Sequence, residues 1–274
     1  MRASSLELIM FASTHEWVHR AMAAGICSFL VDWEYRGKRD RQRGAETEIE
    51  PDTADNLYRL QQYSVPRRFC RVNPYGQWTP AEVNRAIDAG ATDLFLPMVK
   101  KPSEVSATRE HIAGRCRLGI LIETQEALNN LAEIAREQID FVYVGLNDLA
   151  ISRGDRSIFH GLLDGTVERV RNVFADVAFG CAGVTAVDCG WPVPARLILA
   201  ELARLACTFS FARRSFRRDM AHRDLTFEMN RIQSMWTELL GRSLAEVQLD
   251  HTQLTDKIGK IDGSSVAHSP VAAS

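Results

Sequence analysis

Eight short apolar runs, each of strand length, recur along the 274 residues and alternate with longer segments of helical spacing. Continuous apolar runs are typical of strands buried on both faces, and intervening helices indicate a parallel sheet. The runs begin at Leu6, Ser28, Arg67, Asp93, Arg117, Asp140, Ala178 and Cys207. Eight such units in about 240 residues predict a closed (β/α)8 barrel, the TIM-barrel fold.

The segments between the runs carry helix signals. HEWVHRAMAAG ends at Gly25 and TPAEVNRAIDAG ends at Gly90, as expected of helices closed by a C-terminal glycine. Pro80 and Pro194 suit first-turn positions. A doubly wound open sheet is the alternative, but no glycine-rich phosphate-binding fingerprint follows the first strand. The closed barrel is therefore favoured.

We expect a single barrel domain over residues 1–258. Its final helix runs from roughly Asp219 to Leu240 and carries an apolar stripe. The stripe packs in the core or, as an alternative, against a neighbouring subunit. Residues 259–274 are small and polar, so we predict a disordered tail there.

Composition excludes several functional classes. The 33 Lys and Arg residues nearly balance the 35 Asp and Glu residues, so no positive field exists for non-specific binding of nucleic acid or anionic membranes. No apolar run is long enough to cross a bilayer, and the N-terminus is too short and mixed for a signal peptide. The six cysteines form no CxxC pair, so we expect reduced thiols in a cytoplasmic protein.

Polar side chains follow five of the eight runs, where burial alone would not select them. In a TIM barrel the C-terminal ends of the strands meet at one opening, here called the mouth. The mouth should therefore collect acids, amides and guanidinium groups from these positions: Asp32, Glu34, Tyr35, Arg71, Asn73, Glu123, Thr124, Asn147, Asp148, Arg213, Arg214 and Ser215.

Carboxylates from neighbouring strands suit a hard divalent cation, and an arginine from another strand suits a bidentate hold on a substrate carboxylate. Together they indicate a site that binds a 2-oxo acid and stabilises its enolate. Each residue also has a structural interpretation: Asp148 could be a helix N-cap, and Arg71 a surface or ion-pairing residue. The seven histidines lack HxH and HExxH spacing, so a zinc site is not expected.

Two basic segments lie near strand ends. RGKRDRQRG, from Arg36 to Gly44, is either a solvated loop or an element that recognises an anionic substrate or covers the site. RRSFRRD, from Arg213 to Asp219, has the same two interpretations. TIM barrels often bind phosphate near their last strands, and this strengthens the functional interpretation of the second segment.

Four segments in order resemble the HpcH/HpaI aldolase and citrate lyase family, in its metal-dependent pyruvate-aldolase branch. They are FLVDWEY, CRVNP, GILIETQEAL and FVYVGLNDLA, and LPMV and ARRSF also fit. The resemblance spans about Leu6 to Leu240. It implies a TIM barrel, often with a C-terminal helix exchanged between subunits, assembled as trimers or hexamers.

The resemblance also implies a divalent metal, Mg²⁺ before Mn²⁺ or Co²⁺, bound by Glu123 and Asp148. Arg71 would bind the carboxylate and oxo group of pyruvate. Asp32 and Glu34 would organise water at the mouth. Three further residues are substrate-binding candidates: Gly145, Asn147 and Arg213.

One position departs from the family pattern. Pyruvate aldolases of this family often carry a histidine where this chain has Tyr35. A tyrosine relays a proton only if its pKa, ordinarily about 10, is lowered or if it acts through water. Proton transfer is therefore left open among Asp32, Glu34 and Tyr35. No second acid follows Glu34 directly, which argues against a coenzyme A thioester as substrate.

We therefore expect a metal-dependent carbon–carbon lyase or aldolase that joins a pyruvate-type enolate to an aldehyde or oxo acid, or runs the cleavage. A citrate-lyase-like or citrate-synthase-like reaction is the first alternative, and phosphoenolpyruvate chemistry is the next. A non-catalytic protein that binds metal and oxo acid is the alternative from another class.

Overall fold

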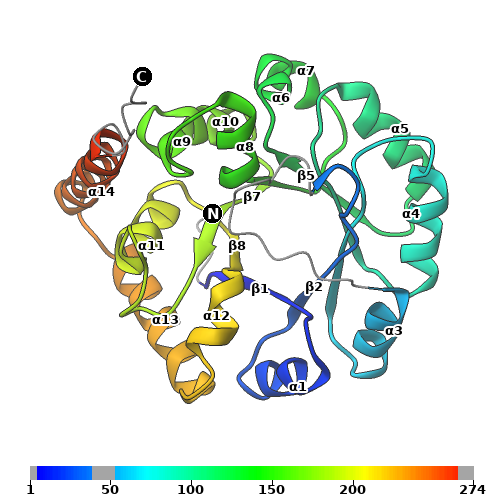
Figure 1. Cartoon of the computed structure of the whole chain (residues 1–274), viewed down its shortest axis with the longest axis horizontal. Coiled ribbons are helices and arrows are strands. Elements are labelled where there is room, and N and C mark those ends of the chain that lie inside the picture. Colours follow the sequence, from blue (N-terminus) through cyan, green and yellow to red (C-terminus); the bar gives the residue numbers. More distant parts are fainter. Residues whose placement is uncertain (1–4, 39–52, 265–274) are drawn as a thin grey trace, which may run out of the picture.

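The computed structural model describes residues 5–38 and 53–264. Eight parallel strands form a closed barrel in chain order, and the last strand pairs with the first (Figure 1). This confirms the predicted TIM barrel. The strands are β1 (Glu7–Phe11), β2 (Ser28–Asp32), β3 (Arg67–Arg71), β4 (Asp93–Leu96), β5 (Arg117–Ile122), β6 (Phe141–Val144), β7 (Ala178–Val184) and β8 (Phe209–Ala212).

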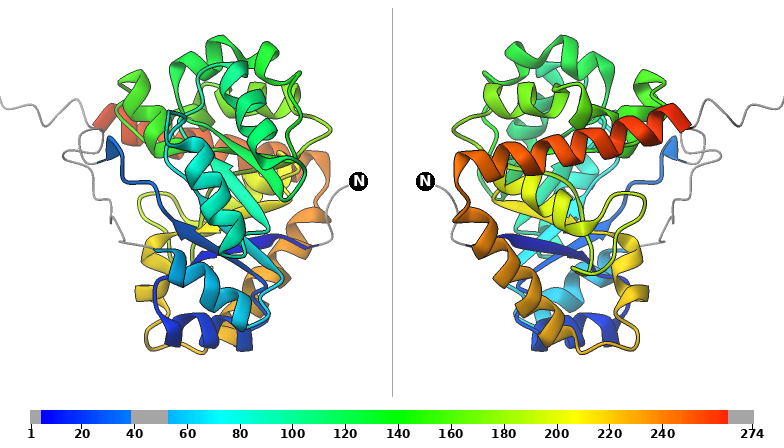
Figure 2. Two further views of the ribbon diagram at one scale, coloured as in Figure 1. Left: turned by 90° about the vertical axis from the view of Figure 1, so that its right-hand side faces the viewer. Right: turned by 90° about the vertical axis from the view of Figure 1, so that its left-hand side faces the viewer.

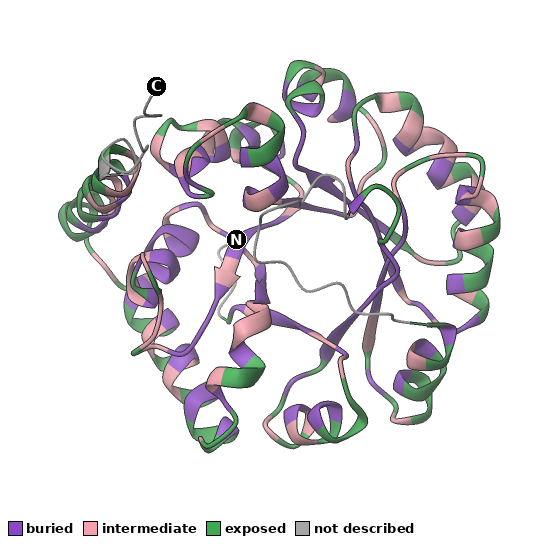
Figure 3. Ribbon diagram, viewed as in Figure 1, coloured by how far each residue is buried: buried purple, intermediate pink, exposed green. Residues whose placement is uncertain are grey.

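Helices surround the barrel, and their apolar faces pack against the outer side of the strands (Figure 3). They are α1 (His15–Ala23), α3 (Ala54–Gln62), α4 (Thr79–Asp88), α5 (Pro102–Ile112), α6 (Gln125–Asn129), α7 (Leu131–Ile134), α8 (Leu146–Arg153), α9 (His160–Leu163), α10 (Thr166–Val173), α11 (Ala195–Arg204), α12 (Arg214–Asp219), α13 (Leu225–Leu240) and α14 (Leu244–Ser264).

Aromatic side chains fill the inside of the barrel. The Phe95 ring lies 4.8 Å from the Phe141 ring and 5.4 Å from those of Phe69 and Phe211, measured between centroids. Tyr143 stacks on Phe211 at 4.1 Å. This packed interior is a second apolar core, separate from the core between strands and helices. The lumen is therefore closed, and polar chemistry is confined to the strand ends.

Ion pairs hold the N-terminal ends of the strands together. Arg67 at the start of β3 donates through Nη2 to the buried Asp93 at the start of β4, at 2.6 Å. Arg67 also pairs with Glu7 of β1, and Arg117 of β5 lies 3.5 Å from Asp93. This end of the barrel, opposite the mouth, is thus tied across four strands by charge.

The C-terminal region differs from the sequence prediction. The chain is not one helix from Asp219 to Leu240, because α12 ends at Asp219 and α13 begins at Leu225. The Asp224 side chain accepts the Phe227 N–H at 3.0 Å and so caps the new helix.

The predicted start of the disordered tail was also wrong, because α14 continues through residues 259–264. α14 buries Leu254 and Ile258 and packs beside α11 and α9 of its own chain (Figure 2). That burial extends the helix where composition alone suggested none. Residues 265–274 lie outside the described residues. Exchange of a C-terminal helix between subunits stays a prediction.

None of the helices in residues 5–38 and 53–264 combines the length and apolarity needed to cross a membrane.

Candidate active site

Asp32 and Arg71 occupy matched positions at the ends of β2 and β3, where they are partners in the strand register. Arg71 donates through Nε to Asp32 Oδ1 at 2.9 Å and through Nη2 to Asp32 Oδ2 at 2.6 Å. Its Nη1 lies 3.4 Å from Glu34 Oε2. All three residues are buried. Asp32 therefore fixes the plane of the Arg71 guanidinium through a two-point contact.

Two further cations reach the same carboxylate. Lys38 Nζ lies 2.9 Å and Arg214 Nη2 3.1 Å from Asp32 Oδ2. Burial alone would raise the pKa of the Asp32 carboxyl, but Arg71 and Lys38 outweigh burial and hold that pKa well below its usual range. Asp32 therefore stays ionised and orients the cations around it.

Lys38 is a residue that the sequence reasoning missed, because it was grouped with a basic loop. It is 1% exposed, and its Nζ lies 3.6 Å from Glu34 Oε2. Burial lowers its pKa, and the nearby Arg71 charge adds to that effect. The one available signal was its position four residues after Glu34. The remaining basic residues of that loop, from 39 to 43, lie outside the described residues.

Glu123 lies just beyond β5, between the segments that follow the neighbouring strands β4 and β6. Its Oε1 accepts the N–H of Met98 at 2.9 Å, and Met98 has a left-handed φ of 54°. Its Oε2 lies so close to Gly145 that a Cβ at that position would be 2.2 Å away. Gly145 therefore leaves room for the Glu123 carboxylate, and its role in binding substrate stays a prediction.

Asp148 is buried in the first turn of α8, and the N-cap of that helix is Gly145. The interpretation of Asp148 as an N-cap was therefore wrong. Burial, then the charges of Asp148 and Glu34, raise the pKa of Glu123 to about 8, although Arg71 opposes them. The carboxylates are thus near enough to repel one another in a buried site.

This donor set fits a hard divalent cation. It consists of carboxylate oxygens, and a bound cation would offset their mutual repulsion. In the part of the chain that the structure describes, no group of three His, Cys, Asp or Glu side chains is arranged to hold a metal ion. Two protein ligands would leave positions for water and substrate, as Mg²⁺ commonly requires.

Asn73 organises the segment after β2. Its Oδ1 accepts the N–H groups of Tyr35 at 3.0 Å and Arg36 at 2.9 Å, and its Nδ2 donates to Glu82 at 2.8 Å. The Tyr35 side chain is 57% exposed and lies beside the Arg36 guanidinium, 5.2 Å from the ring centroid. Tyr35 therefore lies in a far wetter environment than Asp32 and Glu34.

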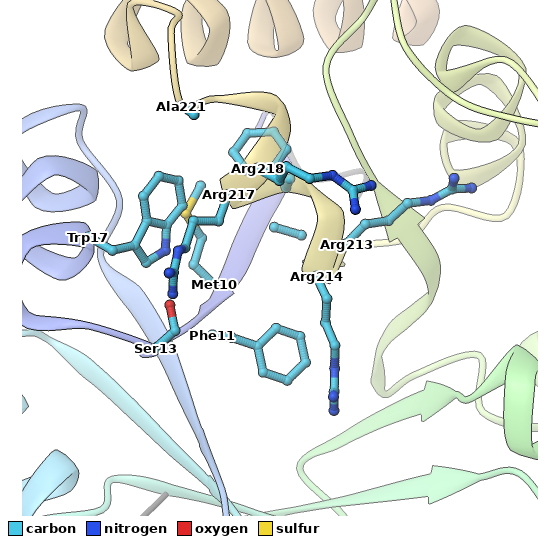
Figure 4. Close-up of a pocket in the computed structure, with 11 residues that line it drawn as sticks. Met10, Phe11, Ser13, Trp17, Arg213, Arg214, Arg217, Arg218 and Ala221 are labelled. Atoms are coloured by element: carbon cyan, nitrogen blue, oxygen red, sulfur yellow. The ribbon is translucent and has the colours of Figure 1, made fainter. Parts of the chain in front are cut away.

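The last predicted residues divide between the site and its surroundings. Arg213 donates through Nε to the Gly183 carbonyl at 3.2 Å and extends over Phe159, whereas Arg214 is the arginine that reaches Asp32. Figure 4 shows these two side chains pointing apart. Asn147 is half-buried in the first turn of α8. The structure thus brings Arg214, rather than Arg213, to the acidic cluster.

Comparison with known proteins places this arrangement in a family. Solved structures of similar fold include an HpcH/HpaI aldolase/citrate lyase family protein from Burkholderia cenocepacia J2315, with 16% identity over 86% of this chain and 95% of that one and a TM-score of 0.57. An HpcH/HpaI aldolase from Desulfitobacterium hafniense DCB-2 has 15% identity over 82% and 93%, with a TM-score of 0.56. The citrate synthase SbnG has 16% identity over 83% and 94%, with a TM-score of 0.58.

At these identities the structural matches show the fold alone. No curated protein sequence matches the chain. The model of the HpcH/HpaI aldolase/citrate lyase family matches residues 11–165, more than half of the chain. That range contains Asp32, Arg71, Glu123 and Asp148. The chain therefore belongs to the HpcH/HpaI aldolase/citrate lyase family.

Proposed function

We propose that the protein is a divalent-metal-dependent carbon–carbon lyase or aldolase. It forms the enolate of pyruvate or a related 2-oxo acid and joins it to an aldehyde or oxo acid, or cleaves the product of that reaction. The observation that carries the proposal is the Arg71 guanidinium, fixed by Asp32 at 2.9 and 2.6 Å, with Glu123 close enough for their charges to interact.

Glu123 and Asp148 would hold the cation, with Mg²⁺ preferred and Mn²⁺ or Co²⁺ as alternatives. When bound, the cation supplies Lewis-acid polarisation of the substrate's oxo group. The backbone N–H of Met98 fixes one oxygen of Glu123, and the space at Gly145 admits the other. These two features orient the Glu123 carboxylate, as a metal ligand, before substrate binds.

Arg71 would bind the substrate carboxylate. A guanidinium has five N–H donors, and the two contacts to Asp32 leave others to hydrogen-bond a carboxylate. Because Asp32 stays ionised, it keeps the guanidinium in one orientation throughout turnover. Asp32 is thus a positioning residue in this proposal, rather than the group that carries the proton.

Proton transfer falls to Glu34, with Lys38 beside it. Both are buried in the segment after β2, and Glu34 Oε2 and Lys38 Nζ lie 3.6 Å apart. Glu34 would accept the methyl proton of the 2-oxo acid, and Lys38 would stabilise the carboxylate before that transfer. Tyr35 is the weaker candidate because its side chain is largely in solvent.

The test is exchange of the pyruvate methyl protons in deuterated water, followed by NMR, with Mg²⁺ and then with EDTA. This reaction needs no acceptor. We expect metal-dependent exchange that falls by at least about a hundredfold in Glu123→Gln and Arg71→Ala. Glu126→Gln is the matched control, because Glu126 lies three residues beyond Glu123 with its side chain 53% exposed.

Other outcomes select among the alternatives. Absent exchange with oxalate and Mn²⁺ still bound would favour citrate-like substrates or phosphoenolpyruvate. Absent exchange with no bound metal would overturn the proposal.

We also propose a homo-oligomer, a trimer or hexamer. Three large apolar side chains are exposed on α14 and on the loop beside it: Trp191 at 84%, Leu244 at 87% and Leu249 at 57%. Lys257 of α14 lies 5.9 Å from the Trp191 ring centroid, so this loop and this helix are adjacent. Light scattering after gel filtration tests the assembly, and a mass of 30.7 kDa would contradict it.

A further inference from the structure

A pocket of about 430 Å³ opens between the end of β1 and α12 (Figure 4). One part of its lining is apolar and consists of Met10, Phe11, Trp17, Ala212, Phe216 and Ala221. The other part carries Ser13 and four arginines, Arg213, Arg214, Arg217 and Arg218. None of these lining residues is acidic. We call it the arginine pocket.

Two cations of the arginine pocket, Arg217 and Arg218, are largely available to a ligand. Among the described residues, Arg217 forms no ion pair, and its side chain runs past Trp17 toward Ser13 (Figure 4). The Arg218 side chain is 81% exposed, and within residues 5–38 and 53–264 its one ion pair is a 4.0 Å contact with the adjacent Asp219. The pocket therefore combines excess positive charge with an apolar wall, which suits a short carbon chain ending in an anion.

Arg214 connects the arginine pocket to the active site. It lines the pocket, its guanidinium lies 5.0 Å from the Phe11 ring centroid, and its Nη2 is 3.1 Å from Asp32 Oδ2. Asp32 in turn holds Arg71. The arginine pocket therefore adjoins the active site through Arg214. Residues 213–218 lie outside the range that the family model matches.

We propose that the arginine pocket binds the phosphate of a phosphorylated aldehyde, the acceptor for the enolate. The inference rests on the function proposed above. A phosphate monoester is a dianion with three terminal oxygens, so it can pair with several guanidinium groups at once, whereas a single carboxylate engages fewer. Binding after the last strand also matches a common position of phosphate sites in TIM barrels.

The kinetic test compares glyceraldehyde 3-phosphate with glyceraldehyde as acceptors for pyruvate. The measured quantity is kcat/KM for glyceraldehyde 3-phosphate divided by kcat/KM for glyceraldehyde. Arg217→Gln should lower this ratio by about ten- to a hundredfold, because it removes a charged contact that only the phosphate makes. Arg136→Gln is the control, since it removes an exposed arginine beyond α7 and should keep the ratio. A ratio unchanged in Arg217→Gln and Arg218→Gln would overturn the proposal.

A binding measurement makes the test independent of turnover. Glycerol 3-phosphate and glycerol are titrated into the protein by calorimetry. Binding that requires the phosphate and weakens about tenfold or more in Arg217→Gln supports the pocket even if pyruvate protons do not exchange. In that case only the proposed function fails. If pyruvate protons exchange normally but glycerol 3-phosphate binds equally well to Arg217→Gln, the proposed phosphate site is overturned and the proposed function is not.

A third acceptor checks the kind of anion. Succinic semialdehyde carries a carboxylate in place of the phosphate. A dependence on Arg217 that is stronger for succinic semialdehyde than for glyceraldehyde 3-phosphate would overturn the phosphate assignment.

Discussion

Gly145 matters to the site because it has no side chain. A Cβ there would lie 2.2 Å from Glu123 Oε2, which is closer than non-bonded atoms approach in proteins. Gly145→Ala should therefore displace the Glu123 carboxylate and weaken Mn²⁺ binding by about ten- to a hundredfold. Titration of Mn²⁺ followed by electron paramagnetic resonance measures the affinity.

The control for this substitution is Gly161→Ala in α9. A Cβ at Gly161 meets only ordinary contacts, the nearest at 3.6 Å, so Mn²⁺ affinity should be retained. Equal affinity in both variants would mean that Glu123 is not a ligand or that its carboxylate has a second productive position.

Glu123 also predicts how stability depends on pH in the metal-free protein. Burial and the neighbouring acids raise its pKa to about 8 in the folded state, against about 4.3 when unfolded. The folded protein thus binds the extra proton, so the free energy of unfolding should fall by a few kcal/mol as the pH rises between these values. Urea unfolding at several pH values measures the slope.

Glu123→Gln has no titrating group at position 123 and should flatten that slope, whereas Glu126→Gln should keep it. Saturating Mn²⁺ should also remove the decline in the unsubstituted protein, because the cation replaces the proton. An unaltered decline in Glu123→Gln would contradict this origin.

At the level of residues, the sequence predicts which types gather at the mouth but not which way they turn. Asp32 and Arg71 could be paired because both end strands that are neighbours in the barrel. Arg213 and Arg214 are adjacent in sequence, and only the backbone at the start of α12 decides that Arg214 faces Asp32. The burial of Lys38 likewise depends on how the segment after β2 folds back.

At the level of elements, the strands were predictable because most are short apolar runs, and all eight form at the predicted places. Helix ends were less predictable. The Asp224 cap makes α13 begin at Leu225, after the predicted start at Asp219. The helix α14 extends past Gly259 because it packs against α11 and α9. Packing of this kind is not visible in local composition.

Asp250 attaches α14 to that body. Its Oδ1 accepts from Arg196 of α11 at 2.6 Å, and its other oxygen accepts from Arg242 in the turn before α14. Asp250→Asn should lower the free energy of unfolding by about 2 kcal/mol. In Asp250→Asn, amide hydrogen exchange should become faster in α14 and stay unchanged in the barrel strands. Asp256→Asn, at an exposed position of the same helix, is the control.

The pH dependence of this contact has a definite sign. The pKa of Asp250 is lowered: burial opposes the shift, and Arg196 and Arg242 outweigh it. Its contribution to stability is therefore present above the unfolded pKa of about 3.9 and is lost as the pH falls through the folded value. Asp250→Asn should lose this part of the acid sensitivity, and unaltered acid unfolding of α14 would argue against the attachment.

At the level of the whole molecule, the two ends of the barrel use the same residue types for different purposes. At the mouth, Asp32 gathers Arg71, Lys38 and Arg214 beside the buried carboxylates. At the opposite end, Asp93 joins Arg67 and Arg117 across β3, β4 and β5. The aromatic core of the barrel separates the two clusters. Stability and chemistry should therefore be separable by substitution.

Asp93→Asn and Asp32→Asn test this separation, because each removes one charge from a buried aspartate paired with arginine. Asp93→Asn should lower the free energy of unfolding by about 2 kcal/mol, because the half-buried Arg67 loses one of its two counter-charges, and it should keep pyruvate proton exchange. Asp32→Asn should reduce that exchange at least about a hundredfold, because Arg71 loses its fixed orientation. Urea unfolding and NMR exchange on both variants give the comparison. If Asp93→Asn reduced exchange as much as Asp32→Asn did, the aromatic core would not isolate the mouth, and the fixed orientation of Arg71 would depend on the whole barrel rather than on Asp32.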